Sequence, residues 1–290
     1  MKRFTLTTGA VALAAALALT ACGTETPVPG TPTGAPTDTP SFAAGTTMAK
    51  LSEAGKITIG TKFDQPLFGL VGPDGKPEGF DVEIGKLVAA GLGIPADKIE
   101  WIETVSQNRE PYIQNGQVDI VVATYTINDT RKEVIDFAGP YYIAGQSFLV
   151  PTGNPNGIVS TETLGDNTIC TVTGSTSEKN IKEFTDKVIT LDKYSDCLEP
   201  IRNGDAQALT TDNVILAGLV DQNPDEFEVV DYTFTEEPYG IGLKKGDDDF
   251  RTFINDVLEA AVKDGSWAKA WENTAGKVLP TPEPPPVDRY

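Results

Sequence analysis

Residues 57–61 (ITIGT) and 80–90 (FDVEIGKLVAA) set the pattern that decides the fold. The first stretch is short and rich in β-branched residues, which is typical of a strand. The second repeats its apolar residues at helical spacing, so we expect a helix capped by Asp81 and ended by Gly91 or Gly93. A strand followed closely by an amphipathic helix is the basic unit of an α/β fold.

The same alternation continues and then repeats after residues 146–151 (QSFLVP). Each half combines predicted strands with amphipathic helices, which predicts two α/β lobes with mainly parallel sheets. The further expected strands are 98–103, 118–124, 168–172 and 208–211, and the expected helices are a short one ending near 115–116, one at 177–184 and one around 197–202.

The last third of the chain predicts two more helices. Apolar residues recur at helical spacing over 250–262 and Gly265 follows, while 266–271 begins a second, shorter helix. The acidic triplet 247–249 is favourable at a helix N-terminus. It lacks the alternating ligands around a turn glycine that a calcium loop needs, so we expect no metal site there.

Both ends of the chain differ in composition from the middle. A basic start and a short apolar run predict a secretory signal peptide. The order Leu-Thr-Ala-Cys resembles the lipobox of bacterial lipoproteins, which implies a lipoprotein signal peptide at 1–21 and lipidation at Cys22; the alternative is an ordinary signal peptide with an incidental cysteine. A Pro- and Thr-rich tether is expected at 22–47, and a disordered Pro-rich tail at 276–290. Two acyl chains would hold such a protein stably on the outer face of the cell membrane.

Charge and composition exclude several function classes. The 23 basic and 42 acidic side chains give 23 − 42 = −19, and histidine is absent. A chain without histidine has no imidazole base and no Ser-His-Asp triad, and an acidic chain is a poor partner for nucleic acid. No nucleotide-binding loop is present either, so no cofactor is expected.

Cysteine usage agrees with export. If Cys22 is lipidated, Cys170 and Cys197 remain as an even pair, which usually forms a disulfide in an exported protein. The sequence alone leaves open the alternative of two buried thiols that never meet.

Three motifs carry polar side chains to positions where α/β sheets bind ligands. The stretch 119–131 ends a strand in Thr124 and Thr126 and then supplies Arg131, whose guanidinium suits a carboxylate. Residues 173–177 (TGSTS) open a helix, either as an anion site or as an ordinary N-cap. Asp212 lies at the carboxyl end of a strand.

In this order, around a helix start at 79–81, the motifs resemble the polar amino-acid family of ABC-transporter solute-binding proteins. The resemblance covers residues 57–271, and 106–109 (SQNR) with 114–119 is similar to the glutamate/aspartate receptors in particular. It implies the bilobal type II periplasmic-binding fold, with two lobes joined by a two-strand hinge. The implied lobe 1 comprises residues 48–142 and 239–275, and the implied lobe 2 comprises 143–238, with crossings near 143–150 and 235–238.

The resemblance also implies how the ligand backbone is held. Arg131, Thr126 and the backbone near Thr176 would bind the α-carboxylate, and Asp212 would bind the α-ammonium. Some relatives carry histidine near the position of Tyr194, where this chain would offer a hydroxyl group instead.

The same resemblance implies that a second basic region binds the ligand side chain. Ser106 and Arg109 match the positions that receive the side-chain carboxylate in acidic-amino-acid receptors, helped by Thr124. A basic residue after the first strand is expected to be Lys62, although the alignment could place Thr61 there. An acidic amino acid carries two carboxylates and one ammonium, and Arg131, Arg109 and Asp212 supply the opposite charges.

The expected protein is thus a monomeric receptor, not an enzyme, that binds L-glutamate or L-aspartate and docks on ABC permease subunits. Two alternatives remain open on the sequence. A sensor for a membrane signalling partner would have the same site, and some dehydratases share the fold, but no nucleophile with an adjacent base is found in this chain.

Overall fold

The computed structural model describes residues 40–290. The expected signal peptide at 1–21, the lipidated Cys22 and most of the expected tether at 22–47 lie outside the described residues. Within 40–290, no helix is both long enough and apolar enough to cross a bilayer.

A five-stranded sheet with the order β5-β1-β6-β13-β7 organises the first lobe. β1 pairs in parallel with β5 and β6, as the alternation of strands and helices predicts, whereas β13 runs antiparallel between β6 and β7. The strands are β1 (Ile57–Thr61), β5 (Ile99–Glu103), β6 (Ile120–Val121), β7 (Ile135–Ala144) and β13 (Glu237–Lys244). The helices are α1 (Thr47–Ala54), α2 (Phe80–Gly91), α3 (Arg109–Gln114), α4 (Asp129–Lys132), α8 (Asp248–Asp264) and α9 (Ser266–Asn273).

A second five-stranded sheet, with the order β10-β9-β11-β8-β12, organises the second lobe. Its parallel strands β10, β9 and β11 are flanked by the antiparallel strands β8 and β12. The strands are β8 (Gln146–Pro151), β9 (Ile169–Val172), β10 (Val188–Leu191), β11 (Ala208–Asp212) and β12 (Phe227–Val229). The helices are α5 (Thr176–Ile181), α6 (Leu198–Asn203) and α7 (Asn213–Gln222).

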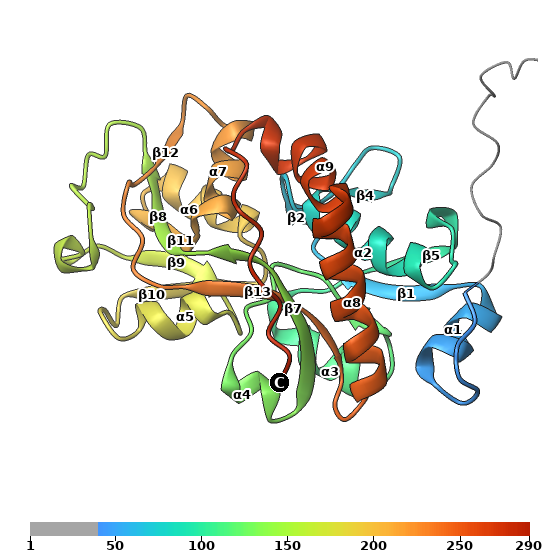
Figure 1. Ribbon diagram of the computed structural model, residues 1–290. Helices are drawn as coiled ribbons and strands as arrows, with labels where there is room; N and C mark the ends of the chain where they lie inside the picture. The colour runs from blue at the N-terminus through green and yellow to red at the C-terminus, as the bar shows by residue number, and fades with distance from the viewer. Residues whose placement is uncertain (1–39) are drawn as a thin grey trace, which may run out of the picture. The chain divides into compact units, whose positions relative to one another are not determined.

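The chain passes between the two sheets twice. It leaves the first sheet at the end of β7 and returns to it at the start of β13, where Glu237 pairs with Ala144. Figure 1 shows β7 and β13 side by side between the two lobes. Two α/β sheets connected in this way confirm the predicted bilobal fold.

A small sheet and an aromatic cluster complete the first lobe. The strands β2 (Asp64–Gln65), β3 (Gly69–Val71) and β4 (Pro77–Glu78) form an antiparallel sheet between β1 and α2. Beneath it, Trp271 of α9 lies with its ring centroid 5.1 Å from that of Phe80 and 5.0 Å from that of Tyr142. Phe68 joins the same cluster, and its ring centroid lies 6.1 Å from that of Tyr239. The cluster therefore fixes the ring of Tyr239, whose hydroxyl donates to Asp212 of the second lobe.

Asp81 does not cap α2, contrary to the sequence prediction. The helix begins after Gly79, and no side chain caps it there. Asp81 instead lies fully buried inside the helix, where its carboxylate accepts hydrogen bonds from the Thr124 backbone N–H at 2.7 Å and the Tyr141 hydroxyl at 2.6 Å. The carboxylate binds groups from other segments and does not cap the helix, because the loop after β6 brings a backbone N–H to it.

The ends of the folded part also differ from the prediction. Residues 40–46 were expected in the tether, yet Phe42 packs edge-on against Phe253 of α8 at 5.5 Å and Thr46 caps α1. The tail at 276–290, expected to be disordered, runs along the first lobe toward α4 in Figure 1. The Tyr290 hydroxyl accepts a hydrogen bond from the Phe137 N–H at 2.8 Å. Composition misses this segment because its contacts are few and far apart: Leu279 and Val287 pack against the hydrophobic core, and the Asp288 N–H donates to the Gly139 carbonyl at 2.7 Å.

Deleting residues 280–290 is expected to lower the melting temperature by about 4 °C, which corresponds to a loss of about 1–2 kcal/mol. The deletion removes the Tyr290 ring from between Lys132 and Arg251, whose charged groups lie 3.9 and 4.2 Å from the ring centroid. Calorimetric melting of the deletion measures the effect. Glu283→Ala, an exposed change within the same segment, is the control and should melt like the parent. A deletion that melts with the parent would show that these contacts add nothing.

Candidate functional site

The predicted binding residues lie together at the boundary between the two lobes. The first lobe supplies residues that follow β1, β5 and β6, and the second supplies residues at the start of α5, before α6 and at the end of β11. All of them except the half-buried Thr176 are at most 7% exposed. The set comprises Lys62, Ser106, Arg109, Thr124, Thr126, Arg131, Thr176, Tyr194 and Asp212.

Arg131 stands where the first lobe meets α5. Its Nη1 donates to the Thr126 carbonyl at 2.7 Å, its Nε to Glu110 Oε1 at 3.1 Å, and its Nη2 to the Gly174 carbonyl of the second lobe at 3.4 Å. The Thr126 and Thr176 hydroxyl oxygens lie 3.5 Å apart across the same boundary. Burial and the nearby Arg109 lower the pKa of Arg131 from its usual value. The guanidinium is thus held rigidly beside hydroxyl groups from both lobes.

A second basic region lies deeper in the first lobe. Lys62 Nζ donates to Ser106 Oγ at 2.9 Å, while Arg109 donates through Nε to the Ser106 carbonyl at 3.2 Å and through Nη1 to the Ala123 carbonyl at 3.1 Å. Within the described residues, no ion pair joins Lys62 or Arg109 to a carboxylate. Burial, with the charge of Arg109, lowers the pKa of Lys62 to about 7. The hydrogen bonds of Lys62 and Arg109 therefore go to neutral groups, although the carboxylates of Asp64 and Asp81 lie near enough to raise the pKa of Lys62.

Both arginines lie over the Tyr125 ring. The guanidinium carbons of Arg109 and Arg131 lie 4.1 and 4.9 Å from its centroid. Such stacking favours the charged form and restricts the orientation of each fork. The sequence analysis missed this role, although Tyr125 stands between the two threonines that it did select.

Asp212 supplies the negative pole from the end of β11. Its Oδ2 accepts the Tyr239 hydroxyl at 2.6 Å, whereas Oδ1 is buried without a hydrogen-bond partner among residues 40–290. Burial, reinforced by the nearby Glu237, raises the pKa of Asp212 to about 7. A buried carboxylate oxygen that lacks a donor is suited to receive one from a ligand. The sequence analysis missed Glu237 and Tyr239, which set the environment of this carboxylate.

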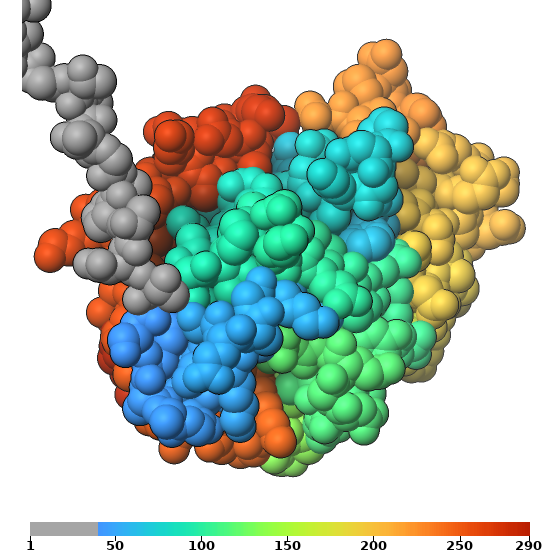
Figure 2. All heavy atoms as spheres, turned by 90° about the vertical axis from the view of Figure 1, so that its right-hand side faces the viewer, coloured from blue at the N-terminus to red at the C-terminus, as the bar shows by residue number. Residues whose placement is uncertain are grey.

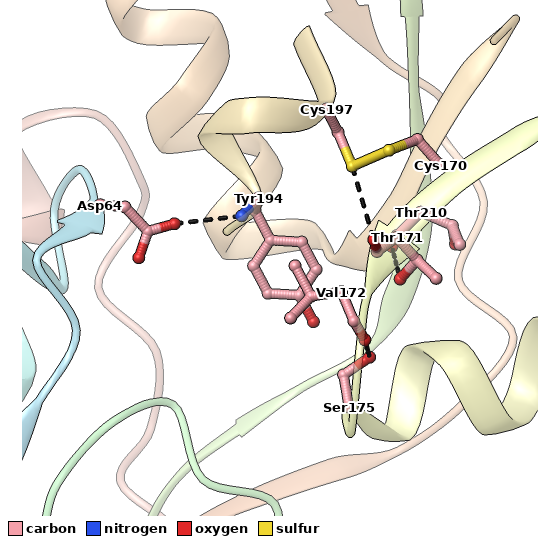
Figure 3. Close-up of a disulfide and its surroundings, with 8 residues drawn as sticks. All are labelled: Asp64, Cys170, Thr171, Val172, Ser175, Tyr194, Cys197 and Thr210. Carbon is pink, nitrogen blue, oxygen red and sulfur yellow. Dashed lines mark hydrogen bonds between the residues drawn. A yellow bond between two sulfur atoms is a disulfide. The ribbon is translucent and has the colours of Figure 1, made fainter. Parts of the chain in front are cut away.

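Tyr194, a residue of the second lobe, contacts its own lobe through its side chain and the first lobe through its backbone. Its N–H donates to Asp64 Oδ2 at 3.1 Å, and its hydroxyl lies 3.5 Å from Ser177 Oγ. Figure 3 shows Asp64 and the disulfide on either side of Tyr194. The disulfide, predicted from cysteine arithmetic, joins Cys170 of β9 to Cys197. It ties the turn that carries Tyr194 to the second sheet.

Gln65 is a buried polar residue that the sequence analysis did not select. It is fully buried, its Oε1 accepts the Thr124 hydroxyl at 2.9 Å, and its Nε2 lacks a hydrogen-bond partner in the described part of the chain. Thr124 itself has φ 44°, a left-handed conformation that is unusual for a β-branched residue. Its place beside Lys62 and Asp64, in the segment that directly follows β1, was the available signal.

Two lobes with a polar, buried site at their boundary define a class of receptor that closes around a small solute. Comparison with known proteins places the chain within that class. Residues 57–275 match the bacterial extracellular solute-binding proteins, family 3, and the chain belongs to this family.

Individual relatives agree with the family. The chain is 40% identical over 237 residues to the glutamate-binding protein GluB of Corynebacterium efficiens, covering 78% of this chain and 80% of that protein. It is 36% identical over 266 residues to the ABC transporter glutamine-binding protein GlnH of Bacillus subtilis, covering 90% and 93%. The crystal structure of a solute receptor for L-cysteine from Neisseria gonorrhoeae superposes with a TM-score of 0.75 at 32% identity, covering 80% and 94%.

Proposed function

We propose that the protein is an extracytoplasmic receptor that binds an acidic amino acid, with L-glutamate as the first candidate and L-aspartate as the second. The observation that carries the proposal is the pair of buried cations, Lys62 and Arg109, which have only neutral hydrogen-bond partners among residues 40–290. Asp64 and Asp81 act on Lys62 without forming an ion pair among residues 40–290, so the two positive charges are incompletely compensated. A ligand side-chain carboxylate would relieve the cost of burying them. A neutral carboxamide would not, which favours glutamate over glutamine.

The remaining charges fit the backbone of an α-amino acid. Arg131, with the hydroxyl groups of Thr126 and Thr176, would bind the α-carboxylate, and Asp212 Oδ1 would accept the α-ammonium. Ser106, Thr124 and Tyr194 would complete the pocket as hydrogen-bonding groups. Relatives named for glutamate and for glutamine both support an amino-acid ligand.

Membership of the solute-binding family supports a role in import. We propose that the monomeric receptor is anchored to the outer face of the cell membrane through lipidated Cys22 and delivers its ligand to the permease subunits of an ABC importer. Ligand that bridges the two lobes would stabilise the lobe-closed form that the permease recognises. We expect the protein to release its ligand without converting it chemically. Recovery of unmodified glutamate after incubation with the protein tests this expectation.

Calorimetry with glutamate, aspartate, glutamine and asparagine tests the side-chain pocket. Arg109→Met is expected to weaken glutamate and aspartate binding by about 30-fold or more, since it removes one partner of a buried charge pair, and to change glutamine and asparagine binding by less than about 3-fold. Lys98→Met removes an exposed cation far from the site and serves as the control. Equal losses for all four ligands, or none, would place the side-chain pocket elsewhere.

A further inference from the structure

Residues 64–66 of the first lobe lie against the second lobe, where Asp64 and Pro66 make the contacts. Asp64 and Gln65 form β2, and Asp64 is 8% exposed. The Asp64 carboxylate accepts the backbone N–H of Tyr194 at 3.1 Å. In Figure 2 the blue-to-cyan surface of this part of the first lobe touches the yellow surface of the second. A buried carboxylate on one lobe therefore depends on a donor that only the other lobe supplies.

Gly218 makes the second contact of this segment. It lies in the interior of α7 and is buried. A Cβ atom at this position would lie 2.5 Å from the Pro66 carbonyl oxygen, closer than side-chain atoms pack. Glycine inside a helix is unfavourable relative to alanine. The structure therefore gives Gly218 a role that α7 alone does not explain: it lets the two lobes approach.

The same edge of the boundary carries two more polar contacts. Gln107 Nε2 donates to Asp192 Oδ1 at 3.0 Å, and Lys193 Nζ lies 2.5 Å from Glu103 Oε1. The Lys193 and Glu103 side chains are more than a third exposed, and exposed pairs contribute little. Of the contacts along this edge, the buried ones of Asp64 and Gly218 are thus expected to contribute most to lobe closure.

We propose that Asp64, Pro66 and Gly218 form a closure latch: they position the lobes around the ligand without contacting it. This inference rests on the proposed function, because it assigns residues that set the affinity of that site. If a ligand binds only the closed form, its apparent Kd equals its intrinsic Kd divided by the fraction of molecules that are closed. A change that lowers this fraction therefore raises the apparent Kd. The Cys170–Cys197 disulfide supports the latch because it fixes the turn that presents the Tyr194 N–H.

Gly218→Ala tests the latch. We expect the Kd for glutamate to rise by about 10- to 100-fold, because overpacking at the contact disfavours closure, and to rise equally for every amino acid that the protein binds. The melting temperature without ligand should stay equal or increase, since alanine suits α7 better. Small-angle X-ray scattering should show compaction with glutamate for the parent and less for the variant. Gln222→Ala, exposed on the same helix, is the control and should match the parent.

Asp64→Ala and Asp64→Asn provide an independent test of the same latch. We expect Asp64→Ala to weaken all ligands uniformly and Asp64→Asn, which keeps an acceptor oxygen, to restore part of the affinity. If the parent binds no acidic amino acid, the proposed function fails. If the parent binds glutamate and Gly218→Ala and Asp64→Ala bind it equally well, the latch is wrong. A loss confined to one ligand also overturns it, because that pattern indicates direct contact.

Discussion

Replacing Asp212 with asparagine is expected to weaken glutamate binding by about 100-fold or more, because it removes the buried counter-charge of the ligand ammonium. Asparagine has the same shape, so the Tyr239 hydroxyl keeps an oxygen acceptor in place of the carboxylate that it contacts at 2.6 Å. Every α-amino acid should be affected alike, since the ammonium is common to all of them. Calorimetric titration with glutamate and glutamine measures both the size and the uniformity of the loss.

The same change should not destabilise the ligand-free fold. The pKa of Asp212 is raised from 3.8 to about 7 by burial and by Glu237, so the folded state favours the neutral form. For a carboxyl group with a raised pKa, the stabilising contribution is complete below pH about 4 and is lost as the pH rises through about 7. Asparagine stays neutral, and the variant should therefore melt at the same temperature as the parent, or higher, at pH 8.

Asp136→Asn is the matched control for this experiment. Asp136 is another buried carboxylate, but it pairs with Lys245 Nζ at 2.9 Å and accepts the Gly246 N–H at 2.7 Å, away from the ligand site. We expect it to lose stability and keep its affinity, the reverse of Asp212→Asn. If Asp212→Asn melts lower and still binds glutamate, Asp212 is a structural residue and the proposed ammonium site is wrong.

Much of the fold could be predicted because it depends on local patterns. The strand at 57–61 and the helices at 80–90 and 250–262 have apolar periodicities that survive in β1, α2 and α8. The strand expected at 118–124 is only two residues long in β6, because Thr124 turns away with φ 44° and bonds to Asp81. The end of this strand is set by a tertiary contact, which a local sequence pattern cannot reveal.

The site was partly predictable for a different reason. Charged residues that follow strands, such as Arg131 and Asp212, stand out from an apolar background and match a familiar arrangement of motifs. Gln65, Tyr125 and Tyr239 do not stand out, because their roles arise from contacts between segments far apart in sequence, such as Tyr239 with Asp212. The proposed latch is harder still to predict from the sequence, because Gly218 has no side chain that would indicate a contact.

Glutamate affinity is expected to peak near pH 7 and to fall on both sides. Binding needs Asp212 ionised and Lys62 protonated, and in the ligand-free protein both groups have a pKa of about 7. Below pH 7, Asp212 holds a proton that binding must release. Above pH 7, Lys62 has lost a proton that binding must recover. Each limb should approach about a tenfold change in Kd per pH unit.

The sign of the proton exchange separates the two limbs. Titration calorimetry in buffers of different ionisation enthalpy should report proton release at pH 6, uptake at pH 8 and little net exchange near pH 7. Asp81 also has a pKa raised to about 7 and interacts with the charges of Lys62 and Arg109, so the exchange measured with Asp81→Asn gives its contribution.

Single substitutions assign each limb to its residue. Asp212→Asn should flatten the acid limb at the lower affinity described above, while Lys62→Met should flatten the alkaline limb and weaken acidic ligands more than glutamine. An affinity that stays constant from pH 6 to 8 would contradict the placement of these two groups against the ligand, since their pKa values could not then change on binding. A single limb would identify which of the two contacts the ligand makes. The pH profile thus tests both charged ends of the proposed site in one series of measurements.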